Sequence, residues 1–511
     1  MLQLVHFIAS WYLKKRMDHV QWFMEHPHEV QHKVFRHLVT QGALTSFGSE
    51  HGLTADMSRR AFVEQVPVRS YEGLFPWIER AFQGEENILW PEAIKWFAKS
   101  SGTTNDISKY IPVSHESMEL CHFHAGQDML AIYFHNNPDS KLFTGKSLSI
   151  GGSHQPNPFN PEIRLGDVSA VLTENLPIVY ELARTPSKEV ALLSDWEEKI
   201  HKMYEEVAFE DVTSIAGVPT WTLVLIRYLL EHRGIDSGNL LEIWPNLELY
   251  LHGGVGFDPY RTQFKQLIPS SQMNYMDCYN ASEGFFGLQN DLNDPNLLLL
   301  LDYGIYYEFI PMSELGKDFP QALALEEIEL GENYAMAITT NGGLWRYLIG
   351  DTIMFTSDNP YKFRITGRTK HFINAFGEEL MVDNADRAIS EASQETAAIV
   401  KDYTAGPIYF EGDAGKGGHE WLIEFDQAPK DFDAFCRKLD DTLRVLNSDY
   451  AAKRQGDIAL AFPKIHQVPI GTFHNWMKKR GKLGGQNKVP RLANNRNYVD
   501  EILEDLSNPA S

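Results

Sequence analysis

A run of small and hydroxyl-bearing residues near position 100 is the stretch of this sequence best suited to bind phosphate. Residues 100–104 read Ser-Ser-Gly-Thr-Thr, and a cation follows at Lys109. One glycine permits a tight turn, so backbone N–H groups and hydroxyls can point at the same anion. A plain solvated loop has the same composition, so the other motifs must decide between these two interpretations.

Two later stretches place candidate ligand-binding residues after predicted strands. Residues 249–254 end in Gly253-Gly254, where bare backbone lets a flat base approach closely. Residues 276–284 present an aromatic ring, a hydroxyl and a carboxylate within five positions, at Tyr279, Ser282 and Glu283. An ordinary strand end with a buried tyrosine and a solvated glutamate is the alternative.

Residues 334–351 predict a β-hairpin that leads to an acidic residue. Tyr334–Thr340 alternates in character, Asn341-Gly342 is a hairpin turn signal, and Leu344–Ile349 predicts the returning strand. Asp351 then follows the end of that strand. Its carboxylate could accept hydrogen bonds from both hydroxyls of a ribose, or it could only stabilise the turn.

Cations are concentrated near the C-terminus. The chain has a net charge of −23, yet residues 478–491 hold six lysines and arginines, among them Lys488 and Arg491. Gly484-Gly485 precedes Lys488 and predicts a loop that could carry an ammonium group to a polyphosphate. An exposed basic patch is the simpler alternative.

Composition limits the class of protein. A chain of 511 residues predicts a large domain and a smaller one, and 43% hydrophobic residues are enough for a core. The net charge of −23 makes nucleic acid and anionic membrane poor partners. Three scattered cysteines predict a reducing, cytoplasmic location. The apolar run Leu4–Leu13 precedes its basic residues, so we expect an amphipathic first helix and no cleaved leader.

Helix and strand signals alternate along the chain and predict an α/β protein. We expect a helix over Pro91–Ala98, and a helix that Ser114 caps and in which Met118 lies on the apolar stripe. That helix also contains His122 and His124, whose spacing turns the two rings to different sides, so they do not form a metal site. We also expect an apolar helix that begins at Pro219 and that Gly234 ends. We place the domain boundary after the strand Phe363–Thr366, which gives domains of residues 1–366 and 367–511 and a hinge at 367–370.

In this order the motifs resemble those of a known enzyme family. The sequence is similar to the acyl-acid amido synthetases historically called the Gretchen Hagen auxin-responsive family, and in particular to its bacterial members. Ser100–Lys109, Tyr279–Glu283 and Tyr347–Asp351 match its three motifs, and residues 486–491 match its Gln-x-Lys-x-Pro-Arg run. The third motif has Leu348 where plant members carry arginine, although Arg346 lies two residues earlier.

The resemblance extends to the adenylate-forming superfamily and implies a large N-terminal domain, a small mobile α+β C-terminal domain, and ATP and Mg²⁺ as cofactors. The phosphates would contact the hydroxyl loop and the adenine would contact the glycine pair and a stacked tyrosine. A serine would face the α-phosphate, while an aspartate and an arginine would bind the ribose. The implied ATP-binding residues are Ser100, Ser101, Gly102, Thr103, Thr104, Gly253, Gly254, Tyr279, Ser282, Asp351 and Arg368.

Two residues carry the implied chemistry. Glu283 would bind Mg²⁺, and Lys488 would bridge the substrate carboxylate and the α-phosphate while an acyl-adenylate forms. An amino-acid amine would then take the acyl group. A thioester-forming acyl-CoA ligase and a nucleotide-binding protein without turnover are the alternatives. We expect Met118 and His122 to line the acyl pocket, the substrates to be small molecules, and the chain to be a monomer or a weak dimer.

Overall fold

The computed structural model describes most of the chain. The described residues are 2–100, 109–157, 160–254, 256–317, 319–369, 372–373, 378, 380–408, 417–447, 450–451, 454, 460–482, 488–493 and 495–507. Contacts divide the chain into unit 1, Met1–Val255 with Leu267–Arg364, and unit 2, Gly256–Gln266 with Ile365–Ser511. No described helix is long and apolar enough to cross a membrane.

Unit 1 is built on an 11-stranded mixed sheet in the order β12-β13-β14-β15-β11-β10-β9-β8-β7-β3-β6. From β6 to β9 the strands are parallel, so their carboxyl ends lie on one edge. The parallel strands are β3 (Lys146–Ser149), β6 (Arg184–Thr185), β7 (Val212–Ala216), β8 (Leu249–Gly253) and β9 (Asn274–Ala281). The others are β10 (Gly284–Leu288), β11 (Leu297–Leu299), β12 (Ile305–Pro311), β13 (Asn333–Thr340), β14 (Tyr347–Asp358) and β15 (Tyr361–Arg368).

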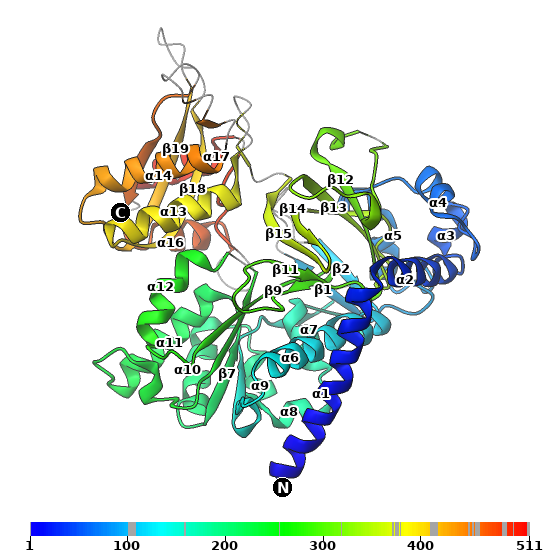
Figure 1. Ribbon diagram of the computed structural model, residues 1–511, viewed down its shortest axis with the longest axis horizontal. Helices are drawn as coiled ribbons and strands as arrows, with labels where there is room; N and C mark the ends of the chain where they lie inside the picture. The colour runs from blue at the N-terminus through cyan, green and yellow to red at the C-terminus, as the bar shows by residue number, and fades with distance from the viewer. Residues whose placement is uncertain are drawn as a thin grey trace. The chain divides into compact units, whose positions relative to one another are not determined.

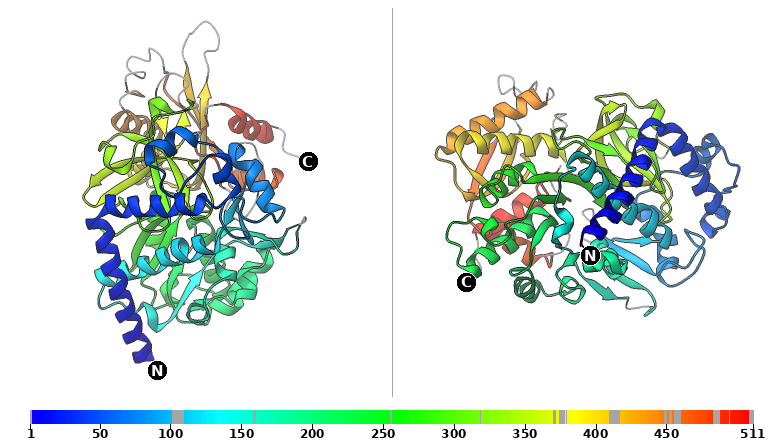
Figure 2. Two further views of the ribbon diagram at one scale, coloured as in Figure 1. Left: turned by 90° about the vertical axis from the view of Figure 1, so that its right-hand side faces the viewer. Right: turned by 60° about the horizontal axis from the view of Figure 1, so that its bottom comes forward.

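Helices cover both sides of the parallel strands (Figure 1). α1 (Leu2–Glu25) packs against α6 (His124–Asn136), and α10 (Trp196–Val207) packs against α11 (Pro219–Arg233). Figure 2 shows α1 as a long helix that continues into α2 (Pro27–Gly42) after a break. α11 begins at Pro219 and ends before Gly234, whose φ of 65° is left-handed, as the sequence predicts.

A second, small sheet has the order β2-β1-β5-β4 and carries the ends of the phosphate-like loop. Its strands are β1 (Trp96–Ser100), β2 (Lys109–Val113), β5 (Arg164–Gly166) and β4 (His154–Pro156). The helix predicted over Pro91–Ala98 is therefore wrong. Phe97 and Ala98 are 0% exposed between the two strands that flank β1, and this pairing overrides the local helical pattern.

The predicted hairpin is present with two differences. The returning strand β14 begins at Tyr347 and not at Leu344, because Gly343 and Arg346 have φ of 93° and 44°, outside the extended region. β14 also continues to Asp358, so Asp351 lies inside a strand and not at its end. Its register against β13 shifts next to Asp351, where Gly350 has a φ of 92°. Such a bulge redirects a side chain.

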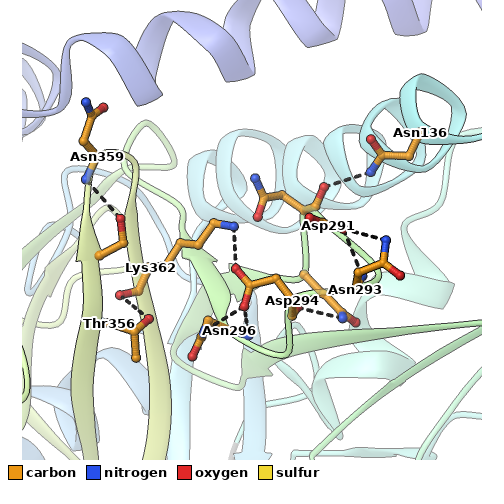
Figure 3. A network of polar contacts seen from close by, with 11 residues as sticks. Asn136, Asp291, Asn293, Asp294, Asn296, Thr356, Asn359 and Lys362 are labelled. Atoms are coloured by element: carbon orange, nitrogen blue, oxygen red, sulfur yellow. Dashed lines mark hydrogen bonds and ion pairs between the residues drawn. The ribbon is translucent and has the colours of Figure 1, made fainter.

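A polar network fixes the connection between β10 and β11 (Figure 3). Lys362 of β15 contacts Asp294 with its Nζ 2.7 Å from Oδ2, and Asn136 of α6 donates to the carbonyl of Asn290 at 2.8 Å. β11 is only three residues long, so these contacts add to a short ladder between β11 and β15. These contacts stabilise the strands that lie between β9, where the second motif begins, and β14, which carries the third motif.

Unit 2 is built on the sheet β18-β19-β20. Alternate residues of β19 belong to two apolar clusters: Trp421 and Ile423 pack with α13 and α14, and Leu422 packs with α16 and α17. These elements are β18 (Ile399–Ile408), β19 (Gly418–Gln427), β20 (Lys464–Val468), α13 (Val382–Thr396), α14 (Phe432–Leu446), α16 (Thr472–Lys479) and α17 (Asn497–Ser507). α12 (Asp258–Leu267) begins in the segment of unit 2 that interrupts unit 1.

Candidate active site

Two tyrosine–carboxylate pairs join the second and third motifs in unit 1. The hydroxyl of Tyr279 donates to Oδ2 of Asp351, and the hydroxyl of Tyr347 donates to Oε1 of Glu283 at 3.3 Å. In each motif the two residues are four positions apart, and the first residue of one pairs with the last of the other. The motifs therefore run past each other in opposite directions, in contact at both ends.

The sheet must curl to make these contacts. β9 carries Tyr279 and is separated from β14 by β10, β11 and β15. Four neighbouring steps in a flat sheet span about 19 Å, far beyond a hydrogen bond. The mixed part of the sheet therefore curls over. This brings Asp351 to Tyr279 in β9 and Tyr347 to Glu283, which follows β9.

Burial keeps the Tyr347 hydroxyl protonated. Tyr279 is 7% exposed, Asp351 is 6% exposed and Tyr347 is 0% exposed. Burial, followed by the negative charge of Glu283, raises the pKa of Tyr347 well above its ordinary value, so its hydroxyl stays a donor. Glu283 thus has a fixed donor that orients its carboxylate.

The phosphate-like loop begins and ends beside this site. Ser100 pairs with Lys109 in the β1–β2 ladder, and Nζ of Lys109 lies 5.6 Å from the centre of the Tyr71 ring. The hydroxyl of Tyr71 accepts from the N–H of Tyr110 at 2.9 Å, and burial raises the pKa of Tyr71 to about 12. Tyr71 also lies near Tyr347, and both Glu283 and Tyr71 contribute to the raised pKa of Tyr347. The loop residues Ser101, Gly102, Thr103 and Thr104 lie outside the described residues.

The glycine pair lies at the carboxyl end of β8, one strand from the second motif. A side chain on Gly253 would place its Cβ 2.5 Å from the carbonyl oxygen of Cys278, so packing alone requires glycine there. Gly254 is exposed and has a φ of 79°. Ser282 follows β9 and is half-buried. Contact of these residues with a nucleotide stays a prediction.

The two candidate acyl-pocket residues lie on one turn of π-helix, Ser117–Phe123, ahead of α6. The helix that contains this turn begins at His115, and Ser114 caps it as predicted, since the Ser114 hydroxyl accepts from the N–H of Ser117 at 2.8 Å. Met118 and His122 are 4% and 5% exposed. Burial lowers the pKa of His122 to about 4, and its Nδ1 has no partner among the described residues. The π-helix packs on β10, which begins directly after Glu283.

Comparison with known proteins identifies the family. Three domains of one family match in order: the GH3 family N-terminal domain over residues 16–273, the central domain over 298–368 and the C-terminal domain over 383–497. The chain belongs to the GH3 family.

GH3 relatives with assigned activities are acid–amido ligases. The chain is 24% identical to an indole-3-acetic acid-amido synthetase, GH3.3, of Arabidopsis thaliana, with 90% of this chain and 89% of the relative covered. It is 22% identical to the jasmonoyl–L-amino acid synthetase JAR4 of Nicotiana attenuata, covering 94% and 93%. This GH3 chain is thus an acyl acid amido synthetase, a ligase.

Solved structures show the same fold. The GH3.15 acyl acid amido synthetase in complex with 2,4-DB has a TM-score of 0.77 at 16% identity, with 96% of each chain covered. A 2-hydroxyisobutyryl-CoA ligase has a TM-score of 0.59 at 12% identity, covering 94% and 91%. The predicted fold class, a mixed α/β chain with a large N-terminal and a smaller C-terminal part, is confirmed.

In unit 2 of this GH3 chain, Arg491 anchors the segment that carries Lys488. Its guanidinium forms an ion pair with Asp402, donates to the hydroxyl of Tyr260 at 3.0 Å and lies 4.5 Å from the Tyr403 ring. The carbonyl of Arg491 accepts from the N–H of Ala405 in β18 at 2.9 Å, and the N–H of Ala493 donates to the carbonyl of Ala405 at 3.0 Å. Lys488 is exposed three residues before this anchor. Arg368 ends β15, and its side chain lies outside the described residues.

Sequence reasoning missed three structural features, two in unit 1 and one in unit 2. Tyr71 has no motif around it, and only the fold places it beside Lys109. Arg491 belongs to the Gln-x-Lys-x-Pro-Arg run, but its role as an anchor appears only in the contacts. Arg346 is 2% exposed and pairs with Glu308 at 2.8 Å, so it supports the hairpin and does not replace the arginine absent at position 348.

The donor set around Glu283 fits Mg²⁺ held partly by a substrate. Among the described residues no three histidine, cysteine or carboxylate side chains form a metal cluster. Mg²⁺ commonly takes one or two protein carboxylates and completes its shell with phosphate oxygens and water. Glu283, oriented by Tyr347, would supply one such oxygen ligand.

Proposed function

We propose that this chain activates a carboxylic acid with ATP and passes the acyl group to an amino acid. In the first step the acid attacks the α-phosphorus of ATP, which forms an acyl-adenylate and releases pyrophosphate. In the second step the amine attacks the activated carbonyl and releases AMP. The pairing of Tyr279 with Asp351 and of Glu283 with Tyr347 carries this proposal, because it joins two motifs 68 residues apart at one place.

Each motif has a proposed role in the first step. Glu283 would hold Mg²⁺, whose charge neutralises the phosphate oxygens. The carboxylate of Asp351 would accept from the ribose hydroxyls, and Tyr279 would lie against the adenine. Lys488 would supply a positive charge between the attacking carboxylate and the α-phosphate. The family membership and the curled sheet support these roles.

Residues of the hydroxyl loop and of the hinge complete the proposed nucleotide site. Ser100–Thr104 would bind the phosphates, Gly253 and Gly254 would border the base, and Ser282 would face the α-phosphate. Arg368 would bind the ribose. We also keep the domains 1–366 and 367–511, with a hinge at 367–370 whose rotation would withdraw Lys488 before the amine attacks.

The π-helix is the proposed wall of the acyl pocket. The neutral imidazole of His122 is buried, and its Nδ1 has no hydrogen-bond partner in the described part of the chain. It can therefore accept one hydrogen bond from a polar group on the acid, or donate one to it. Met118 adds adaptable apolar surface. We infer a small carboxylic acid with an apolar body as substrate.

The setting of the reaction is also proposed. We propose a bacterial, cytoplasmic enzyme that acts as a monomer or weak dimer on small molecules and needs ATP and Mg²⁺. Its three cysteines are all described and all unpaired in disulfides, which supports a reducing compartment.

Acid-dependent exchange of pyrophosphate into ATP tests the first step. A panel of aryl, indole and fatty acids should include at least one that drives exchange, and ATP binding without exchange for any of them would point to a protein without turnover. The second step is tested with the active acid, comparing CoA with 20 amino acids and identifying the product by mass spectrometry. A thioester and no amide would identify an acyl-CoA ligase instead.

A further inference from the structure

Charged side chains line a pocket of about 640 Å³ at the β6 edge of the large sheet, in unit 1. The pocket lies among α8 (Ile178–Leu182), β6, α9 (Lys188–Ala191) and the end of α10, and Lys146 at the start of β3 also lines it. Three cations and four carboxylates face it, and the proposed reaction uses none of them.

Most of these charges are already satisfied. Arg184 donates from Nε and Nη2 to Glu181 at 3.3 and 2.9 Å. Lys188 pairs with Glu174 at 3.2 Å. Glu206 accepts from the N–H and the hydroxyl of Ser187 at 2.6 and 2.7 Å. These contacts give the pocket fixed walls.

Two buried polar atoms lack a partner, and they belong to side chains of opposite charge. Nη1 of Arg184 is buried without a hydrogen-bond partner among the described residues, and so is Oε2 of Glu210. Arg184 is 8% exposed. A buried ionic group that lacks a partner is costly, and native proteins normally supply one from the protein, water or a ligand. Both groups line the same pocket.

The pair selects the chemistry of a ligand. A simple anion would meet four carboxylates, and a simple cation would meet the unpaired guanidinium nitrogen and the Lys146 ammonium. A molecule with one carboxylate and one ammonium group satisfies both, with its carboxylate on Arg184 and its ammonium on Glu210. We infer that this pocket binds a free amino acid as its zwitterion.

This site is distinct from the one where the acyl group is transferred. Lys146 begins β3, whereas the candidate active site lies where the parallel strands end, at Gly253 of β8 and Glu283 after β9. β3 runs from Lys146 to Ser149, about 10 Å along the strand, and β9 lies three strands away, about 14 Å across the sheet. An amino acid bound here cannot reach the adenylate, so the inference goes beyond the proposed function and does not depend on it.

Calorimetry on the full-length protein, without ATP or acid, tests the inference with 20 free amino acids. We expect saturable binding of at least one amino acid. Replacing Glu210→Gln or Arg184→Gln should weaken that binding at least tenfold. Glu205→Gln is the matched control, because Glu205 lies five residues before Glu210, in the last turns of α10, is exposed and does not line the pocket. This control should bind as the parent protein does.

Two derivatives of the bound amino acid then test the zwitterion itself. The N-acetyl derivative lacks the ammonium group and the carboxamide lacks the carboxylate, so each should bind at least tenfold more weakly. Undiminished binding of either would identify a simple anion or cation site and overturn the inference. Amino-acid binding that persists in both Glu210→Gln and Arg184→Gln belongs to the reaction site and also overturns the inference. The absence of any binding overturns it as well.

Acid-dependent pyrophosphate exchange of the same variants separates this result from the proposed function. Glu210→Gln should leave exchange unchanged, which also shows that the variant is folded. Loss of amino-acid binding with normal exchange supports the pocket, whereas loss of exchange in Glu210→Gln would contradict a site distinct from the catalytic one.

Discussion

Replacing Tyr347→Phe removes one hydroxyl from the candidate active site and leaves the ring. The ring is 0% exposed and keeps its packing, while Glu283 loses the donor 3.3 Å away. A hydrogen bond to a charged group contributes about 1.5–3 kcal/mol, and one at this length falls at the lower limit. If the hydroxyl orients Glu283 toward Mg·ATP, about 1.5 kcal/mol is lost, which is roughly tenfold in kcat/KM.

The assay is pyrophosphate exchange at saturating acid, with ATP and Mg²⁺ varied. Tyr334→Phe is the matched control: Tyr334 lies on the neighbouring strand β13, is 2% exposed, and its hydroxyl accepts from the N–H of Glu329 at 2.8 Å. Both variants should lose similar stability, and only Tyr347→Phe should lose exchange. Equal exchange in the two variants would show that the hydroxyl does not orient a catalytic carboxylate.

Three further outcomes follow from the contacts. Arg491→Met leaves Asp402 without its half-buried partner, which costs about 1–3 kcal/mol. Hydrogen exchange should accelerate in β18 and not in β8, and equal rates would contradict the anchor. The pKa of His122 is about 4 in the folded chain and ~6.5 when unfolded, so the unfolded chain binds the proton first as pH falls. Between pH 7 and pH 5 the free energy of unfolding of the parent protein should fall by ~2 kcal/mol, and that of His122→Leu should not show this fall. Urea unfolding measures both values, and parallel curves of unfolding free energy against pH would refute the prediction. EDTA should abolish pyrophosphate exchange and added Mg²⁺ should restore it; exchange that persists in EDTA would refute the role of Glu283.

The local elements of this fold could largely be predicted from sequence, and the failures have physical causes. Proline before an apolar run and glycine after it place α11 correctly, since both act through their own backbone angles. Pro91–Ala98 looks helical by period but becomes strand β1, because two partner strands take up its backbone groups. The later start of β14 and its register shift against β13 could not be predicted from the sequence either, since they depend on Arg346 and Gly350 adopting positive φ.

The sequence by itself determined the family motifs, their order and the chemistry of their side chains, because residue type and spacing are properties of the chain alone. Only the tertiary structure decided which motif residues meet. Tyr279 reaches Asp351, and Tyr347 reaches Glu283, because the sheet curls through three intervening strands, and that curvature is a property of the whole sheet. The roles of Tyr71 and Arg491 and the Arg184–Glu210 pocket could not be predicted from the sequence either, because packing assembles them from separate elements.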